Sequence, residues 1–521
     1  MQQLFSMMPI PSRVCLEINP EMQKGTMKLL SFISFTCYFL QATCCFSQGI
    51  ISPVWMKTKV SPFTGGFAEA WAVDVDEWGH VYWAANVDSM AGHGHDMLIY
   101  KFDADGNSLW LSPLHFGGVN SQQAYVCNAK DTFLYIGGRD AVNGFVSDML
   151  LLKVNKSNGE LVWSKTYDFN LGGYNEIDAV EIRDDGIYCG GWAQAVTTGS
   201  YQVDLGLLKL DFSGDTIWKN HFGQANAGEH QDGHFVVDDN HIFAAGLWGG
   251  TSLFNFYNGW SFLGTFSKST GEFADSTLFG HQSGNFGDLE NALGMTSDGT
   301  DLYVTGYTSP ATKDLQIMIA RFDKNLNLVW NKNWGGSYDE SARGIIVNDG
   351  KIFIAGTTKS YSGIPGVNQD AVLLVYDTSG NFLSYQTWGD SLTDEFRDLV
   401  AYENSIYLSG TSRGNDGDTA FLIKTTVDSV ITPIRENALQ EVFLYLYPNP
   451  FSSQAIFHST ISLHDATLTV ENCFGQQVKQ MKDLRGQSIT FYRNALPGGF
   501  YIARLWQDDQ VIATKKLIIT D

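Results

Sequence analysis

Six glutamates recur at nearly the same distance ahead of a strand-like aromatic run, and repeated carboxylates could do chemistry. They are Glu69, Glu176, Glu229, Glu290, Glu340 and Glu395. A second acidic series opens a later apolar run: Asp96, Asp148, Asp204, Asp314, Asp370 and Asp418. A ring of such carboxylates could hold a cation or a polar ligand. Alternatively, each accepts hydrogen bonds from backbone N–H groups in its own turn, and a feature copied in every repeat favours that architectural interpretation.

Aromatic side chains gather in the two longest irregular segments of the chain. Trp192 and Tyr201 lie in the first segment, and Trp248, Tyr257 and Trp260 lie in the second. Exposed aromatic rings near carboxylates can bind a sugar ring or a peptide by stacking and hydrogen bonding. The rings could equally fold their own loops onto the scaffold, so binding and packing both stay open.

Other motifs point to no specific reaction. Asp103-Ala104-Asp105-Gly106-Asn107 resembles a calcium loop, but it lacks the distal glutamate and coincides with a hairpin turn. No catalytic triad order, phosphate loop or dinucleotide motif occurs in the sequence. We therefore assign no catalytic residue, no metal ligand and no cofactor, with calcium left open without a specific motif. The formal net charge of -23 argues against nucleic acid or an anionic membrane as partner.

The elements that position these residues form a repeat of about fifty-five residues across 65–427. Its clearest part is an aromatic strand such as Leu134-Tyr135-Ile136-Gly137, which occurs seven times. Each copy contains four strand-like runs separated by Asp-Gly or Asn-Gly turns, which are typical of hairpins. This pattern predicts an all-β, seven-bladed β-propeller. Strand directions place both acidic series and the long loops at one end of it.

The last copy lacks its fourth strand, and the start of the chain can supply one. Val54-Trp55-Met56-Lys57-Thr58 reads like Val162-Trp163-Ser164-Lys165-Thr166 in an earlier copy. We therefore expect a propeller over 49–427, closed by an N-terminal strand at 53–59, because closure removes exposed sheet edges.

The repeat resembles a known bacterial family. Its pattern runs Asp-x-Leu-Leu-x-Lys-x-Asp, Gly-x-x-x-Trp, Phe-Gly-Gly, Glu, and Ile-Tyr-x-x-Gly, and it resembles the bacterial β-propeller repeat (SBBP) family over most of residues 54–427. The fourth copy departs most, with Trp260 in place of the opening aspartate and Phe273 near the usual tryptophan. The resemblance implies an extracellular propeller and says little about activity.

The N-terminal region has the features of an export signal. Lys28 precedes an apolar run from Leu29 to Leu40, and small residues follow as far as Ser47. We expect a signal peptide at 27–48 and interpret 1–26 as a non-native or misassigned start. The run is too short to span a membrane as a helix, and no later segment approaches its length.

The residue pattern of the C-terminal region differs from that of the repeats. A linker is expected at 428–442, and alternating apolar strands with Gly/Pro turns then predict a small Ig-like β-sandwich at 443–521. Its motifs include Tyr447-Pro448-Asn449-Pro450-Phe451, Leu496-Pro497-Gly498-Gly499-Phe500 and Lys515-Lys516-Leu517-Ile518-Ile519. These resemble the type IX secretion system type A sorting domain of Bacteroidetes. The resemblance implies passage through the periplasm, recognition of the tail by the secretion machinery, and release or attachment at the outer cell surface.

Three functions are compatible with this sequence. We favour a secreted or cell-surface binding module for a glycan or peptide, with the six glutamates and the loop aromatics as candidate contacts. The first alternative is an extracellular glycan hydrolase or lyase that uses carboxylates at the channel mouth. The second is a structural adhesin.

Overall fold

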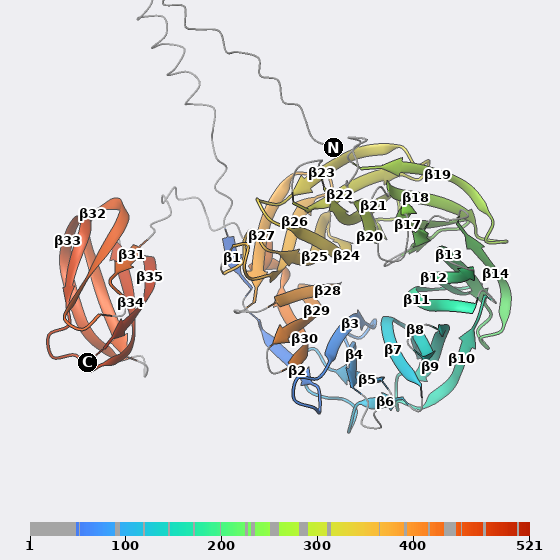
Figure 1. Ribbon diagram of the computed structural model, residues 1–521, viewed down its shortest axis with the longest axis horizontal. Coiled ribbons are helices and arrows are strands. Elements are labelled where there is room, and N and C mark those ends of the chain that lie inside the picture. The colour runs from blue at the N-terminus through green and yellow to red at the C-terminus, as the bar shows by residue number, and fades with distance from the viewer. Residues whose placement is uncertain are drawn as a thin grey trace, which may run out of the picture. The chain divides into compact units, whose positions relative to one another are not determined.

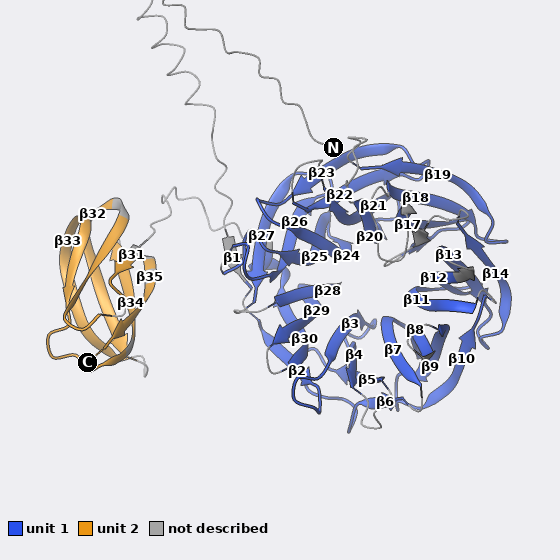
Figure 2. Ribbon diagram, in the orientation of Figure 1, with its two compact units in different colours: residues 1–432 blue, residues 433–521 orange. Residues whose placement is uncertain are grey.

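The computed structural model describes residues 48–520, apart from 52, 89–93, 118–119, 144–145, 170–171, 198–199, 224–227, 231–234, 251–259, 281–289, 310–313, 364, 390–392, 415–416, 432–443, 450, 473–475 and 508–509. The chain divides into two compact units, Met1–Thr432 and Pro433–Asp521 (Figure 2). The segment 1–26 and the expected signal peptide at 27–48, except Gln48, lie outside the described residues.

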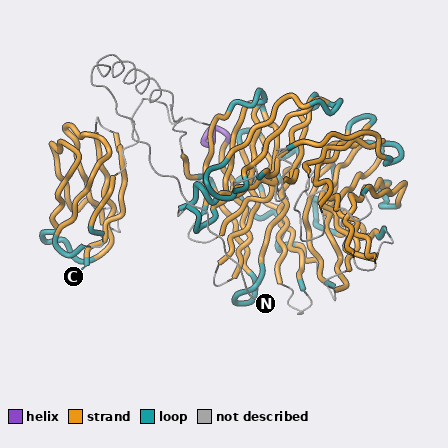
Figure 3. Tube along the Cα trace, turned by 45° about the horizontal axis from the view of Figure 1, so that its top comes forward, coloured by secondary structure: helices purple, strands orange, loops and turns teal. Residues whose placement is uncertain are grey.

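Unit 1 consists of sheets arranged like blades around a central channel (Figure 1). Figure 3 shows that strands joined by short loops make up almost all of its described part, with a short helix, α2 (Val427–Ile431), at its end. The fold is therefore all-β and has the propeller architecture expected from the repeat. None of the described helices is long and apolar enough to cross a membrane.

The strands form antiparallel sets that run from the channel outward in chain order. The first three sets are β3 (Ala68–Val75), β4 (Val81–Asp88), β5 (His95–Phe102) and β6 (Leu114–Phe116); β7 (Ser121–Lys130), β8 (Phe133–Asn143), β9 (Val146–Asn155) and β10 (Leu161–Tyr167); and β11 (Gly172–Arg183), β12 (Gly186–Thr197), β13 (Ser200–Leu210) and β14 (Thr216–Phe222). The next two sets are β15 (Gly228–His230) and β16 (Phe235–Val237) with β17 (His241–Gly250), β18 (Trp260–Ser267) and β19 (Phe273–Phe279); and β20 (Glu290–Ser297), β21 (Asp301–Thr308), β22 (Gln316–Asp323) and β23 (Leu328–Trp334). The last two sets are β24 (Glu340–Asn348), β25 (Lys351–Thr358), β26 (Asp370–Asp377) and β27 (Phe382–Trp388); and β28 (Thr393–Tyr402), β29 (Ser405–Gly414) and β30 (Gly417–Thr426).

Two neighbouring sets share one hydrogen-bonded sheet. The second and third sets are joined by a parallel bridge pair between Ser147 of β9 and Tyr174 of β11, which gives an eight-stranded sheet. The last set gains its outer strand from the start of the chain. There β2 (Trp55–Val60) pairs antiparallel with β30, from Trp55 opposite Lys424 to Val60 opposite Thr419. In addition, β1 (Gln48–Ile50) adds in parallel to β27.

The turns between third and fourth strands explain the calcium-like motif. The carboxylate of Asp103 accepts hydrogen bonds from the backbone N–H groups of Asp105 (3.0 Å) and Asn107 (2.8 Å), and Gly106 has a φ of 82°. Asp323 makes the same contacts with Asn325 and Asn327 in another set. The motif is thus the repeat's own hairpin turn, in which the aspartate satisfies the turn's amides.

The channel is lined by the first strands, and each of β3, β7, β11, β20, β24 and β28 contains a β-bulge. The bulged residues are Trp71, Tyr125, Asp178, Leu293, Arg343 and Arg397. A bulge places an extra side chain on one strand and locally changes its direction. We call the end of the channel where these strands begin the starting end, and the end where they stop the finishing end.

Unit 2 is a five-stranded β domain. It contains β31 (Leu444–Tyr447), β32 (Gln454–Asn472), β33 (Gln477–Tyr492), β34 (Gly499–Gln507) and β35 (Gln510–Ile519). The long β32 pairs with β31, β33 and β34, and β34 pairs with β35. Its buried core includes Phe457, Leu468, Phe491, Leu505 and Leu517. A C-terminal β domain is therefore present where the sequence predicted one.

Candidate functional site

The predicted glutamates lie at the starting end of the channel. Glu69, Glu176, Glu290 and Glu340 are buried, with 5%, 7%, 2% and 1% of their surface exposed. Glu395 is half-buried, and Glu229 lies in β15, but its side chain is outside the described residues. The second acidic series lies at the same end, because Glu340 pairs with Thr358 and Thr358 pairs with Asp370.

Strand register divides the glutamates into two groups. Glu69, Glu176 and Glu395 stand two residues before the bulged residue of their strand. Glu290 and Glu340 stand three residues before it. Since successive strand residues face opposite sides, this one-residue difference gives the two groups different surroundings.

Glu340 caps the turn of its own set. Its Oε1 accepts hydrogen bonds from the Thr358 hydroxyl (3.0 Å) and the Ser360 backbone N–H (2.9 Å), and its Oε2 accepts one from the Gly336 N–H (3.0 Å). Glu290 similarly accepts a hydrogen bond from the Thr308 hydroxyl at 3.2 Å. Glu340 therefore makes the backbone contacts of the architectural alternative, and the contact of Glu290 is to a side-chain hydroxyl.

Glu69 and Glu395 instead pair with arginines. The Glu69 carboxylate contacts Arg413 (2.5 Å) and Arg397 (3.4 Å), and Glu395 contacts the same two residues at 3.3 and 2.5 Å. Burial would raise the pKa of Glu395, but Arg397, Arg413 and Arg343 together lower it below its ordinary value. This carboxylate is held in its charged form.

Around these ion pairs lies a set of side chains that we call the arginine–aromatic cluster. Its members are Arg139, Arg343, Arg397, Arg413, Trp71 and Tyr125. The guanidinium of Arg397 lies 3.6 Å from the centre of the Trp71 ring, and that of Arg343 lies 5.4 Å from it. The Trp71 and Tyr125 rings meet edge to face with centroids 5.3 Å apart. Cation–π attraction and stacking thus fix the orientation of two arginines.

Arg139 extends the cluster along β8. Its guanidinium lies 4.5 Å from the Tyr174 ring centre and 5.8 Å from that of Tyr125. It donates a hydrogen bond to Gln123, and its Nη1 lies 3.9 Å from the Glu176 carboxylate. Burial raises the pKa of the Tyr125 hydroxyl well above its ordinary value.

One contact in the cluster joins two blades that are not neighbours. Arg343 is on β24 and Trp71 is on β3, and β28 stands between these strands in the ring (Figure 1). Side chains from two non-neighbouring blades can meet only if they project into the channel. The bulged residues of β3, β7, β24 and β28 therefore narrow the channel near its starting end.

The second acidic series has mixed roles. Buried Asp96 and Asp204 contact His115 and His221 at 2.7 and 2.6 Å, and the Asp370 carboxylate accepts a hydrogen bond from the Gly363 N–H at 3.1 Å. Asp314 is exposed, and burial raises the pKa of both Asp148 and Asp418. The series does not form a uniform ring.

Only some of the predicted aromatic contact residues have side chains that the structure describes. Trp192 is half-buried, with its ring 6.0 Å from that of Tyr174, so it lies beside the arginine–aromatic cluster. Trp248 pairs across strands with Trp260 and stacks on Phe262 at 5.7 Å. Tyr257 and the side chain of Tyr201 lie outside the described residues. For Trp248 the contacts are those of local packing.

A cavity of about 710 Å³ occupies the finishing end of the channel, and none of the predicted site residues lines it. It is lined by residues that follow the bulges, among them Asp74, Asn128, Glu181, Arg183 and Asp398. Several of these carboxylates bind the backbone of the neighbouring first strand. Asp398 accepts a hydrogen bond from the Val73 N–H (2.9 Å), Asp74 from the Ala129 N–H (2.7 Å), and Glu181 from the Val237 N–H (2.7 Å).

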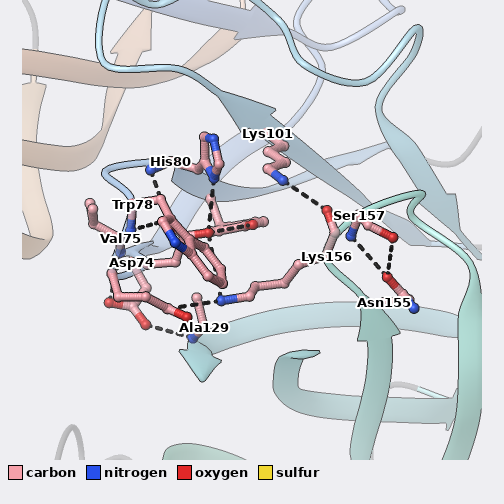
Figure 4. A network of polar contacts seen from close by, with 12 residues as sticks. Asp74, Val75, Trp78, His80, Lys101, Ala129, Asn155, Lys156 and Ser157 are labelled. Atoms are coloured by element: carbon pink, nitrogen blue, oxygen red, sulfur yellow. Dashed lines mark hydrogen bonds and ion pairs between the residues drawn. The ribbon is translucent and has the colours of Figure 1, made fainter. Parts of the chain in front are cut away.

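Figure 4 shows how this end joins the first two sets. Lys156 is 3% exposed, and its Nζ lies 3.2 Å from the Glu77 carboxylate and 4.8 Å from the centre of the Trp78 ring. Lys101 donates to the Lys156 carbonyl oxygen at 2.8 Å. The charged groups of Lys101, Lys156 and Glu77 thus make contacts that hold the first two sets together.

The described residues contain no group of three or more His, Cys, Asp or Glu side chains that could hold a metal ion. The four arginines of the cluster were not among the site residues predicted from the sequence. Only six occur in residues 49–432, and four of them belong to the arginine–aromatic cluster. Their scarcity, and the positions of Arg343 and Arg397 just after Glu340 and Glu395, were the available signal.

Comparison with known proteins assigns the tail and leaves the propeller's role open. Residues 445–520 match the family described as the secretion system C-terminal sorting domain. No curated protein matches this chain.

Similar solved structures include the WD40 domain of Neurospora crassa Pan2, at 8% identity and a TM-score of 0.43, covering 72% of this chain and 97% of that one. The β-propeller domain of the Trilobed protease from Pyrococcus furiosus is similar at 9% identity and a TM-score of 0.39, covering 73% and 99%. An acylaminoacyl peptidase from Pyrococcus horikoshii is similar at 10% identity and a TM-score of 0.40, covering 75% and 57%.

Proposed function

We propose that this protein is an extracellular binding module, exported by the type IX secretion system, that binds a glycan or peptide at the starting end of its channel. The sorting-domain match at 445–520 makes it a secreted or cell-surface protein. For the export route, the proposal includes a signal peptide at 27–48, passage through the periplasm and a Bacteroidetes source. For the fold, it includes a seven-bladed SBBP-type propeller over 49–427 that β2 closes. It also includes recognition of residues 443–521 by the secretion machinery.

The observation that carries the binding role is the arginine–aromatic cluster. In a chain with a net charge of -23, four of six propeller arginines gather with Trp71 and Tyr125 at one end of a channel. Charged and aromatic side chains converging on a rigid scaffold are typical of ligand sites. Trp192 and Glu176, both predicted from the sequence, lie at its margin.

The hydrolase or lyase alternative is less well supported by the glutamates. A glycosidase needs a carboxylic acid whose raised pKa lets it protonate the leaving group. The pKa of Glu395 is lowered by arginines, and Glu340 is engaged by three hydrogen bonds. Neither is poised as a general acid. A structural adhesin is favoured by no specific contact in the described residues.

Binding of the purified full chain to glycan and peptide arrays, followed by a turnover assay on each ligand found, tests the proposal. We expect reversible binding without turnover, and we expect Trp71→Leu to weaken it about tenfold, roughly the value of one lost stacking contact. Trp218→Leu is the matched control, since Trp218 lies on the outer strand β14. No binding, turnover of the ligand, or equal effects of the two substitutions would overturn the proposal.

A further inference from the structure

The four arginines of the arginine–aromatic cluster differ in how closely carboxylates pair with them, and Arg413 also lies 3.8 Å from the Asp418 carboxylate. Glu69 and Glu395 pair with Arg397 and Arg413, and Arg139 lies near Glu176. Arg343 differs from these three arginines. Among the described residues its side chain makes no hydrogen bond or close ion pair; its guanidinium lies 5.4 Å from the centre of the Trp71 ring, and its charge helps to lower the pKa of Glu395.

Arg343 is nevertheless held in a defined place. It is half-buried at the bulge of β24, and its side chain extends past β28 toward the ring that Arg397 also covers. The Nε of Arg397 is buried and has no hydrogen-bond partner in the described structure. A guanidinium presents five N–H donors in a planar fork that matches a carboxylate. The half-buried Arg343 guanidinium, held beside the same tryptophan as the buried Arg397, therefore offers unfilled donor capacity to an anion.

The backbone around the cluster argues against a peptide as the anion's carrier. Peptides that bind sheets usually pair with free backbone amides of an edge strand. Here the channel-side amides are already used by the preceding set: Ala70 donates to Thr411 (3.3 Å), Ala124 to Asn86 (2.8 Å), and Asn175 to Ser147 (3.1 Å). The side chains that flank the cluster are the aromatic rings of Tyr174 and Trp192, which suit the apolar face of a sugar ring.

We propose that the starting end of the channel binds the carboxylate of an acidic sugar, and that Arg343 is its principal anion contact. This inference rests on the proposed binding function and narrows its ligand to uronic-acid glycans. The sugar ring lies toward Tyr125, Tyr174 and Trp192, and the carboxylate lies toward Arg343 and Arg397.

Isothermal titration of the full chain with hexamers of 1,4-linked galacturonate, glucuronate and mannuronate tests this proposal. Each hexamer is compared with its methyl ester, which keeps the sugar backbone and removes the charge. We expect at least one acid hexamer to bind, its ester to bind about tenfold more weakly, and the affinity of the acid form to fall with added salt.

The decisive variant is Arg343→Gln, which removes the charge without breaking a described hydrogen bond. It should weaken binding of the acid hexamer about tenfold and leave binding of the ester unchanged. Arg183→Gln is the matched control, because Arg183 is a first-strand arginine at the finishing end of the same channel. It should leave both affinities unchanged.

The possible failures are distinguishable from one another. Equal binding of acid and ester, or binding of neutral glycans alone, overturns the acidic-sugar proposal and leaves the binding function standing. A larger effect of Arg183→Gln than of Arg343→Gln moves the site to the other end. If a hexaglutamate peptide binds and no uronate hexamer does, the carboxylate comes from a protein and the acidic-sugar proposal is overturned. Absence of binding to all glycans and peptides overturns both proposals.

Discussion

The two ends of the channel use the same kinds of side chain for different purposes. At the finishing end, Asp74, Glu181 and Asp398 each accept a backbone hydrogen bond from the next strand around the ring. At the starting end, Glu69 and Glu395 bind Arg397 and Arg413, and the Arg397 guanidinium lies over the Trp71 ring. Asp74, Glu181 and Asp398 thereby hold neighbouring first strands together, whereas Glu69 and Glu395 hold arginines in place.

This difference shows why residue type alone does not reveal a site. A carboxylate that is saturated by backbone amides has no capacity left for a ligand. A carboxylate that orients an arginine leaves donors of that arginine free for another partner. The starting end is therefore the better candidate for binding, even though the cavity of about 710 Å³ lies at the finishing end.

The largest expected effect comes from opening the ring. The contact between Arg343 and Trp71 joins the blade of β24 to that of β3, so it depends on ring closure. Deleting residues 49–60 removes β2 and its six-residue pairing with β30, and it exposes the edge of that strand. We expect loss of cooperative unfolding, or a fall in melting temperature of roughly 10 °C or more. Circular dichroism melting measures this, and a truncated protein that melts like the full chain would show that β2 does not close the ring.

The fold, and the two possible roles of the glutamates, could be predicted from the sequence. The aromatic runs and Asp-Gly turns predicted the all-β propeller, and both roles of Glu340 were weighed. The spacing of the glutamates, however, does not reveal the bulges that separate Glu340 from Glu395 by register. The cluster was not predictable either, since Arg343 and Trp71 are far apart in sequence and meet only once the ring is formed. Long-range contacts of this kind leave no local pattern.

The next largest effect should separate the two groups of glutamates. Glu340→Ala leaves the Gly336 and Ser360 N–H groups without their acceptor at a site that is 1% exposed. We expect a loss of about 3 kcal/mol in the free energy of unfolding. Glu340→Gln, which keeps one acceptor oxygen, should lose about 1 kcal/mol. Urea unfolding gives both values, and a stable Glu340→Ala protein that no longer binds ligand would reverse the assignment of Glu340 as a cap.

A smaller, pH-dependent effect should distinguish Glu395. Its pKa in the folded protein lies below the ordinary value of 4.5, because arginines outweigh the effect of burial. Its charged form therefore stabilises the fold at pH values above 4.5, and this contribution is lost as the pH falls through the lowered pKa. Glu395→Gln should be less stable than the parent protein at pH 7, and the two should converge in acid. Urea unfolding between pH 7 and pH 3 measures the gap, and a gap that widens in acid would contradict the arginine pairing.

The most direct test of the division between the two ends is the stability of Asp398→Ala beside that of Arg343→Gln, measured by urea unfolding without ligand. Asp398→Ala removes the acceptor of the Val73 N–H at a position that is 8% exposed, and it should cost about 2 kcal/mol. Arg343→Gln breaks no described hydrogen bond, and it should stay within about 0.5 kcal/mol of the parent protein. Equal losses, or a larger loss for Arg343→Gln, would mean that the starting end is built for stability and would contradict its assignment as the binding end.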